Sequence, residues 1–394
     1  MEPLTDEEMT AWRSFPAMQQ PDWGNDWLIG RVSADLTAMP ALVRRNEIER
    51  LRGLLAEVAL GERTIVQAGD CAEDPDECVE DVLSRKVGLL DALAGMMRTN
   101  TGVPVVRVGR IAGQFAKPRS RETVHHNGTE LPVYRGPLVN GPAPEAGARL
   151  PDPLRLVACY RAAATATEYL RAATKPTVWT SHEALILDYE LPLVRRSEDG
   201  HLFLTSTHLP WIGDRTRDLD GVHVRLLSAV RNPVACKIGP NATAEQVLGL
   251  CDRLDPAREP GRLTLVARLG AGVAAHRLPE LVTVVRAAGH PVIWLCDPMH
   301  ANTVVASNGR KIRLLPTVLR EVGEFQDAVT SAGGIAGGLH LETTPHDVLE
   351  CVDDEAAAGT LDNRRYTTLC DPRLNIAQAL TVVSAWRTGG ARRG

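Results

Sequence analysis

The alternation of short apolar runs with longer amphipathic segments is the feature that most constrains how this chain folds. After about residue 60, runs rich in β-branched residues recur, and most are followed by a segment with helical periodicity. We expect strands at 64–69, 104–108, 177–180, 202–206, 234–238, 263–267, 292–295 and 338–341. We expect helices at 76–98, 152–173, 243–253, 278–288, 312–330 and 374–388. Eight strands that alternate with helices predict an α/β fold, a (β/α)8 TIM barrel in preference to an open doubly wound sheet.

The first 60 residues do not follow this alternation. A predicted helix at about 40–60 has one apolar face, formed by Ile48, Leu51, Leu54, Leu55 and Val58. We therefore expect an N-terminal helical extension at 1–60 and a catalytic barrel at 61–394. The segment 116–150 lacks periodicity and is rich in Pro and Gly, which predicts a long functional loop after the second strand.

Composition restricts the class of protein. The net charge of −5 over 394 residues argues against a general nucleic-acid binder. No uncharged apolar run reaches the ~18 residues that a membrane span needs, and the first residues lack the pattern of a signal peptide. The eight cysteines lack the dense spacing of a disulfide scaffold. We expect a reduced, cytoplasmic protein.

Residues 109–120 form a cationic, glycine-rich segment directly after the second expected strand. Arg110, Lys117 and Arg119 alternate with small residues that let the backbone approach a ligand closely. Fixed cations beside such backbone favour a phosphate group. A phosphorylated metabolite is the predicted ligand, and a solvated basic loop is the alternative.

Four potential metal ligands follow expected strands: Cys71, His300, Glu342 and Asp371. In a closed barrel the eighth strand pairs with the first and borders the seventh, so these side chains converge. A thiolate, an imidazole and two carboxylates suit Mn²⁺, Co²⁺, Fe²⁺ or Zn²⁺ better than Ca²⁺. Each residue alone could serve only packing or a capped turn.

A second group of cations also stands at strand ends. Arg110, Lys237 and Arg268 follow apolar runs, where a buried cation is costly unless an anion answers it. Arg215 and Glu183 follow other strands of the same barrel. Two sets of cations on either side of a metal predict two phosphorylated substrates. The alternative is that Lys237 and Arg268 pair with carboxylates inside the barrel.

Six motifs together resemble a known family. They are Gly-Asp-Cys-Ala-Glu, Val-Gly-Arg-Ile-Ala-Gly-Gln-Phe-Ala-Lys-Pro-Arg-Ser, Thr-Ser-His-Glu, Trp-Ile-Gly-Asp-Arg-Thr, Asp-Pro-Met-His and Cys-Asp-Pro-Arg-Leu-Asn. These resemble the class II (plant-type) 3-deoxy-D-arabino-heptulosonate 7-phosphate (DAHP) synthases, over about residues 19–388. The resemblance implies condensation of phosphoenolpyruvate with erythrose 4-phosphate, the first step of the shikimate pathway.

The resemblance also implies roles for residues. It implies that Cys71, His300, Glu342 and Asp371 hold a divalent metal, Mn²⁺ or Co²⁺ first and Zn²⁺ or Fe²⁺ next. It places Arg110, Glu183, Trp211, Arg215, Lys237 and Arg268 around phosphoenolpyruvate, and Lys117, Pro118, Arg119 and Ser120 around erythrose phosphate. Glu183 and Lys237 are the candidates for moving the proton of the attacking water.

Two positions depart from the family pattern, and the chain is short for it. Asp214, counted with the phosphoenolpyruvate-binding residues, stands where a glutamate is expected, and Ala301 where a glycine is expected. The compact length resembles members that serve secondary metabolism, such as phenazine formation. Alternatives are a synthase for an amino or imino analogue of erythrose phosphate and a non-catalytic regulatory paralogue. A homodimer or larger homo-oligomer is expected, with chorismate mutase as a candidate partner.

Overall fold

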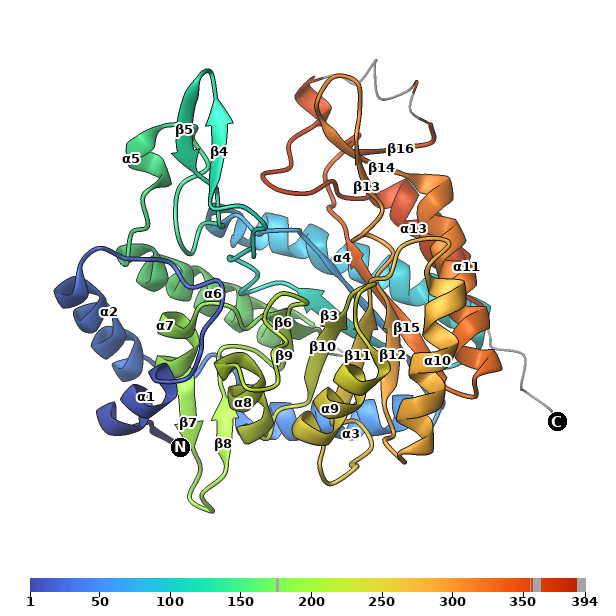
Figure 1. Cartoon of the computed structure of the whole chain (residues 1–394), viewed down its shortest axis with the longest axis horizontal. Helices are drawn as coiled ribbons and strands as arrows, with labels where there is room; N and C mark the ends of the chain where they lie inside the picture. The colour runs from blue at the N-terminus through green and yellow to red at the C-terminus, as the bar shows by residue number, and fades with distance from the viewer. Residues whose placement is uncertain (175–176, 355, 357–362, 388–394) are drawn as a thin grey trace.

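The computed structural model describes residues 1–174, 177–354, 356 and 363–387. Eight parallel strands close into a barrel at its centre (Figure 1). In barrel order they are β2 (Thr64–Gly69), β3 (Val105–Arg110), β6 (Trp179–Glu183), β9 (Leu209–Ile212), β10 (Val234–Ile238), β11 (Leu263–Ala267), β12 (Ile293–Cys296) and β15 (Ile335–Glu342). The predicted (β/α)8 TIM barrel is confirmed, and β15 pairs with β2 as the closure requires.

The prediction that residues 202–206 form the fourth strand of the barrel was wrong. Leu202–Leu204 forms β8, which pairs antiparallel with β7 (Val194–Arg196) in a small sheet that also contains β1 (Glu2–Pro3). The barrel strand is β9, a few residues later, and it contains Pro210. Proline donates no ladder hydrogen bond, so a pattern-based reading demotes such a run. Leu202–Leu204 is an equally apolar run without this defect.

Helices surround the barrel, and the expected ones are confirmed with shifted ends. They are α4 (Glu80–Thr101), α6 (Leu154–Ala173), α9 (Ala244–Leu254), α10 (Ala274–Ala287), α11 (Leu315–Ser331) and α13 (Ile376–Ser384). Sequence reasoning missed the short α8 (Val222–Ala229). The expected end of the last helix, residue 388, lies outside the described residues.

Helix α3 (Arg45–Ala59) closes the end of the barrel at which the strands begin. Figure 1 shows it, in blue, running beneath the barrel strands. Its buried Leu51, Leu55 and Val58 share one apolar cluster with Ile65 and other side chains of the barrel interior. The helices α1 (Asp6–Arg13) and α2 (Asp26–Ala38) precede it. The domain boundary at residue 60 stays a prediction.

Two small sheets rise beyond the other end of the barrel (Figure 1). The expected long loop at 116–150 contains the hairpin β4 (Thr123–His126) and β5 (Thr129–Pro132), and the short helix α5 (Ala146–Arg149). The second sheet consists of β13 (Thr303–Val305), β14 (Lys311–Leu314) and β16 (Cys351–Val352). In the described residues, no helix combines the length and apolar character required for a membrane span.

Candidate active site

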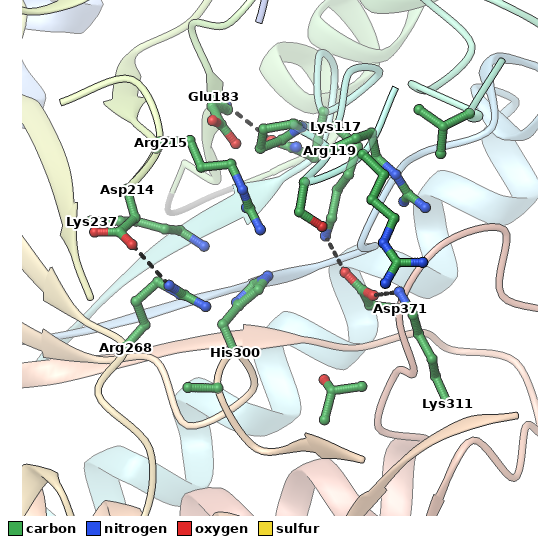
Figure 2. A pocket seen from close by; sticks show the side chains of 18 of the residues that line it. Lys117, Arg119, Glu183, Asp214, Arg215, Lys237, Arg268, His300, Lys311 and Asp371 are labelled. Carbon is green, nitrogen blue, oxygen red and sulfur yellow. Dashed lines mark hydrogen bonds and ion pairs between the residues drawn. The ribbon is translucent and has the colours of Figure 1, made fainter. Parts of the chain in front are cut away.

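A cavity of about 810 Å³ opens at the ends of the barrel strands, and residues of both small sheets line it (Figure 2). All ten residues expected to bind substrate line it, as do Glu183, His300 and Asp371. Cys71 and Glu342 lie behind its wall and are buried. The cavity therefore joins the cationic and the metal-ligand groups in one place.

The four expected metal ligands come together. One ligand atom each from Cys71, Glu342 and Asp371 lie within 4.8 Å of one another. The Nε2 atom of His300 is 3.3 Å from Glu342 Oε1, and its Nδ1 is 2.8 Å from the buried Asp297. A carboxylate on the far ring nitrogen is the usual way in which a ligating histidine is oriented.

The Lys117 ammonium sits among these ligand atoms. Its Nζ lies 2.8 Å from Cys71 Sγ, 2.9 Å from Glu342 Oε1 and 3.1 Å from Asp371 Oδ2 (Figure 2). The three groups thus form a pocket that accepts a cation, and a soft thiolate beside two carboxylates fits a transition metal.

Burial and nearby charge act against each other on the ligand group. Burial would raise the pKa of Glu342, but His300, Lys117 and Arg313 hold it well below its ordinary value. Burial raises the pKa of the Cys71 thiol well above its ordinary value. A protonated thiol is no ligand, so cation binding and deprotonation of Cys71 are coupled.

Gly69 lets the charges on two strands meet. In register, Glu342 of β15 lies opposite Gly69 of β2, which lies opposite Arg110 of β3. Gly69 has a φ of +151°, and a Cβ there would lie 2.6 Å from the Arg110 carbonyl oxygen. Across this gap Arg110 Nη2 donates to Glu342 Oε1 at 3.1 Å.

Sequence reasoning missed three charged residues of the site. Arg313 is buried and donates to Glu342 Oε2 at 2.8 Å, and Lys311 pairs with Asp371 at 2.9 Å (Figure 2). Both lie on β14, where cations two residues apart share one face of a strand. The third, Asp297, stands within the motif that contains His300 and anchors that histidine.

Lys237 and Arg268, two of the cations expected to bind phosphate, pair with carboxylates. This was the alternative that the sequence left open for both residues. Lys237 Nζ lies 3.0 Å from Asp297 Oδ2, and Arg268 Nη1 lies 3.1 Å from Asp214 Oδ2 (Figure 2). Asp214 Oδ1 also accepts from the Gly239 backbone N–H at 2.9 Å. Arg268 still lines the cavity. The residue that pairs with it is Asp214, which stands where the family pattern has a glutamate, so this difference changes the partner of a cation in the cavity.

Two other cations lie in the cavity without such partners. Within the described residues, the side chains of Arg119 and Arg215 make no hydrogen bond or ion pair, and both line the cavity (Figure 2). The second departure, Ala301, has a φ of +68°, a region that favours glycine. It directly follows His300 at the cavity wall.

Glu183 is a buried carboxyl at the cavity. No described residue hydrogen-bonds its Oε1. Burial raises its pKa, against the lowering effect of Lys237 and Lys117. Burial also lowers the pKa of Lys237, against the effect of Asp297. Gly213 makes room for this carboxylate, because a Cβ there would lie 2.0 Å from Glu183 Oε1.

Known proteins resemble this chain over most of its length. It is 55% identical over 379 residues to a probable phospho-2-dehydro-3-deoxyheptonate aldolase of Pseudomonas fluorescens, covering 94% of each chain. It is 41% identical over 424 residues to the phospho-2-dehydro-3-deoxyheptonate aldolase of Streptomyces coelicolor, covering 94% of each. It is 37% identical over 445 residues to that of Mycolicibacterium smegmatis, covering 96% of this chain and 94% of the other.

A solved structure and a family model complete the comparison. The phospho-2-dehydro-3-deoxyheptonate aldolase structure from Francisella tularensis SCHU S4 has a TM-score of 0.54 and 13% identity, covering 93% of this chain and 97% of that one. At that identity it supports the fold alone. The model of the class-II DAHP synthetase family matches residues 7–178 and 173–385. The chain therefore belongs to the class II DAHP synthase family, the enzymes of the first step of the shikimate pathway.

Proposed function

We propose that this enzyme condenses phosphoenolpyruvate with erythrose 4-phosphate and water, releasing DAHP and inorganic phosphate, in a metal-dependent reaction. The observation that carries the proposal is the convergence of Cys71, His300, Glu342 and Asp371 beside a cavity lined by cations. Two anionic substrates repel each other, and cations fixed on both sides of the cavity would hold them at reaction distance.

The same four residues would hold the divalent metal, which we propose to be Mn²⁺ or Co²⁺, with Zn²⁺ and Fe²⁺ as alternatives. The mixed sulfur, nitrogen and oxygen donors support a transition metal. The ammonium of Lys117 among these donors supports their preference for a cation. When bound, such an ion polarises a carbonyl oxygen as a Lewis acid.

The cavity walls suggest how the substrates lie. We assign phosphoenolpyruvate to the wall formed by Arg110, Trp211, Asp214, Arg215, Lys237 and Arg268. We assign the phosphate of erythrose 4-phosphate to Arg119 and Ser120 on the facing loop, with Pro118 and Lys117 between them and the ligand group. Lys311 is a further cation on that side of the cavity. Arg119 and Arg215 support these assignments, because no described residue neutralises either side chain.

The bond changes then follow from this placement. C3 of phosphoenolpyruvate bonds to the aldehyde carbon of erythrose phosphate, and the aldehyde oxygen takes up a proton. The C2–C3 double bond supplies the electron pair for the new bond, water adds to C2, and the C2–oxygen bond to phosphate breaks. The water oxygen becomes the C2 ketone oxygen: one of its two protons balances the proton taken up by the aldehyde oxygen, and the other leaves with the phosphate. We assign the water proton to Glu183, whose Oε1 has no hydrogen-bond partner in the described residues and whose raised pKa strengthens it as a base. The Lys237 ammonium forms an ion pair with Asp297, and we propose that it also stabilises the bound phosphoenolpyruvate.

Phosphoenolpyruvate consumption by purified protein tests the proposal. The protein is treated with EDTA, supplied with erythrose 4-phosphate, and measured before and after Mn²⁺ or Co²⁺ is returned. We expect consumption that needs both the metal and the aldose. Consumption only with an amino analogue of the aldose would support the alternative substrate, and none with any metal or aldose would contradict catalysis.

We further propose that the enzyme serves secondary metabolism. The alignments with the Streptomyces and Mycolicibacterium relatives span 424 and 445 positions, more than the 394 residues of this chain, so those relatives carry insertions. The alignment with the Pseudomonas relative spans only 379.

Light scattering, alone and with a chorismate mutase added, tests the proposed homo-oligomer and partner.

A further inference from the structure

Arg110 is held from several directions within the barrel. A guanidinium has five N–H donors. Nε donates to the Asp70 carbonyl at 2.9 Å, and Nη2 donates to the Cys71 carbonyl and to Glu342 Oε1, each at 3.1 Å. Nη1 lies 2.7 Å from His340 Nε2. Within the described residues these four contacts leave one N–H, on Nη1, for a ligand in the cavity that Arg110 lines.

The contact with His340 fixes the imidazole's hydrogen-bonding roles. Arginine only donates, so His340 Nε2 must accept, and the ring proton lies on Nδ1. Nδ1 lies 2.8 Å from Gln67 Oε1, to which it donates. The orientation of His340 is therefore set by Gln67 on the neighbouring strand.

Gln67 is fixed in turn by a third strand. Its Nε2 donates to Ser181 Oγ at 3.0 Å, and the Ser181 hydroxyl donates to the Gly109 carbonyl at 2.9 Å. Gln67, Ser181 and His340 are fully buried. The chain starts at the Arg110 side chain and ends at the backbone of the residue before it. It crosses β15, β2 and β6 and returns to β3.

An aromatic ring connects this chain to the cavity. The Trp211 indole stands edge-on to His340, with ring centroids 5.3 Å apart and planes at 87°. The Arg110 guanidinium carbon lies 5.2 Å from the centre of the same indole. Trp211 Nε1 is buried without a hydrogen-bond partner in the described residues. The indole and the guanidinium therefore both contact the same imidazole.

We propose that His340, oriented by Gln67 and Ser181, is a positioning residue that fixes the guanidinium plane of Arg110 so that its remaining N–H meets phosphoenolpyruvate. This inference rests on the proposed function. Three other contacts hold Nε and Nη2, and the contact with His340 is the one on Nη1, the nitrogen that has the remaining N–H. Without it that N–H is less firmly placed, and ordering it on binding would weaken the affinity.

A matched pair of amides tests the inference. In His340→Gln the amide oxygen can take the place of Nε2 and still accept from Arg110. In His340→Asn the shorter amide reaches only the place of Nδ1, towards Gln67. We expect His340→Asn to raise the phosphoenolpyruvate KM and its calorimetric Kd at least tenfold, with the erythrose 4-phosphate KM changed less than twofold. His340→Gln should recover most of that loss. Equal constants for the two variants, or wild-type affinity in His340→Asn, would overturn the inference.

Gln67→Met gives a second test that leaves the imidazole in place. It removes the acceptor on Nδ1, and we expect a threefold or greater rise in the phosphoenolpyruvate Kd, measured well below the thermal midpoint, which the loss of two buried hydrogen bonds lowers. An unchanged Kd would overturn the inference even where the His340 variants fail to fold.

Arg110→Ala separates this inference from the proposed function. If that variant binds phosphoenolpyruvate as the wild type does, the assignment of Arg110 to this substrate fails. If Arg110→Ala abolishes binding while His340→Asn and Gln67→Met leave it unchanged, only the positioning role fails.

Discussion

At the scale of single residues, burial in the barrel shifts the pKa of Glu183 and the pKa of Lys237 so that the uncharged form of each is favoured. Both are buried at the cavity, and burial disfavours the charged form of each. The pKa of the carboxyl therefore rises while that of the amine falls. A carboxyl with a raised pKa and an amine with a lowered pKa are the usual partners of a proton exchange in an active site.

Glu183→Gln tests the role proposed for this carboxylate. The amide keeps the shape but cannot accept a proton, so we expect kcat to fall about 10²- to 10⁴-fold, with the phosphoenolpyruvate KM changed only a few-fold. Steady-state kinetics checks both constants. Glu168→Gln, on the exposed face of α6, is the control and should leave the rate unchanged. A near-normal kcat in Glu183→Gln would remove Glu183 from the mechanism.

The residue scale also shows which parts of the site the sequence can reveal. Cys71, His300 and Glu342 could be placed together because strand order in a closed barrel is known before any coordinate is. Arg313 could not, because its contact with Glu342 depends on the path of the chain through β14. The position of Lys117 among the ligands likewise depends on the course of a long loop.

At the scale of elements, helix α11 is tied to the loops of the site by one buried carboxyl. Glu321 Oε1 accepts from the Gly270 N–H at 2.9 Å, and its other oxygen accepts from the Asn302 amide. These residues follow β11 and β12, the strands that carry Arg268 and His300. Burial raises the pKa of Glu321 from its ordinary 4.5 to about 8.

That shift makes stability depend on pH. Between about pH 4.5 and 8 the folded state holds a proton on Glu321 that the unfolded state has lost. This contribution to stability is complete below pH 4.5 and is lost as the pH rises through about 8. We expect Glu321→Gln to flatten the fall of the thermal midpoint between about pH 5 and 8. Parallel curves for variant and wild type would contradict the assignment.

Helix α3 offers a second test at this scale. Leu55 is fully buried in the cluster that closes the barrel, whereas Leu60, just beyond the helix, is 64% exposed. We expect Leu55→Ala to lower the free energy of unfolding by about 2–5 kcal/mol, and Leu60→Ala by less than about 0.5 kcal/mol. Urea titration measures both. Equal small effects would mean that the first 60 residues are a separate extension.

Elements were predicted where periodicity was strong and missed where it was not. The alternation located seven barrel strands because each is a short apolar run before a helix. It failed at β9, where Pro210 interrupts the donor pattern, and at the β4–β5 hairpin, whose strands are largely exposed and carry no apolar face. A hairpin held by its turn and neighbours leaves little trace in hydrophobic spacing.

At the scale of the whole molecule, the ligand group joins the two ends of the barrel sheet. Cys71 follows the first strand and Glu342 ends the last, so a bound ion would bridge the seam. We expect Mn²⁺ at 100 times its Kd to stabilise the folded state by about 2.7 kcal/mol if the unfolded chain does not bind it.

The rise of the thermal midpoint with Mn²⁺ measures this effect without any assay of activity. Asp371→Asn should reduce the rise, and Asp327→Asn, on the exposed face of α11, should not. A midpoint that does not respond to Mn²⁺ or Co²⁺ in the wild type would argue against the proposed metal site.

Cys71 and Asp371 leave the ribosome at different times. They are 300 residues apart, so at about 5–20 residues per second the second follows the first by roughly 15 to 60 s. Throughout that interval the thiol of Cys71 exists without the carboxylate beside which it finally lies. A polypeptide cut short anywhere between Cys71 and Asp371 therefore lacks part of the group, however well its earlier strands have formed.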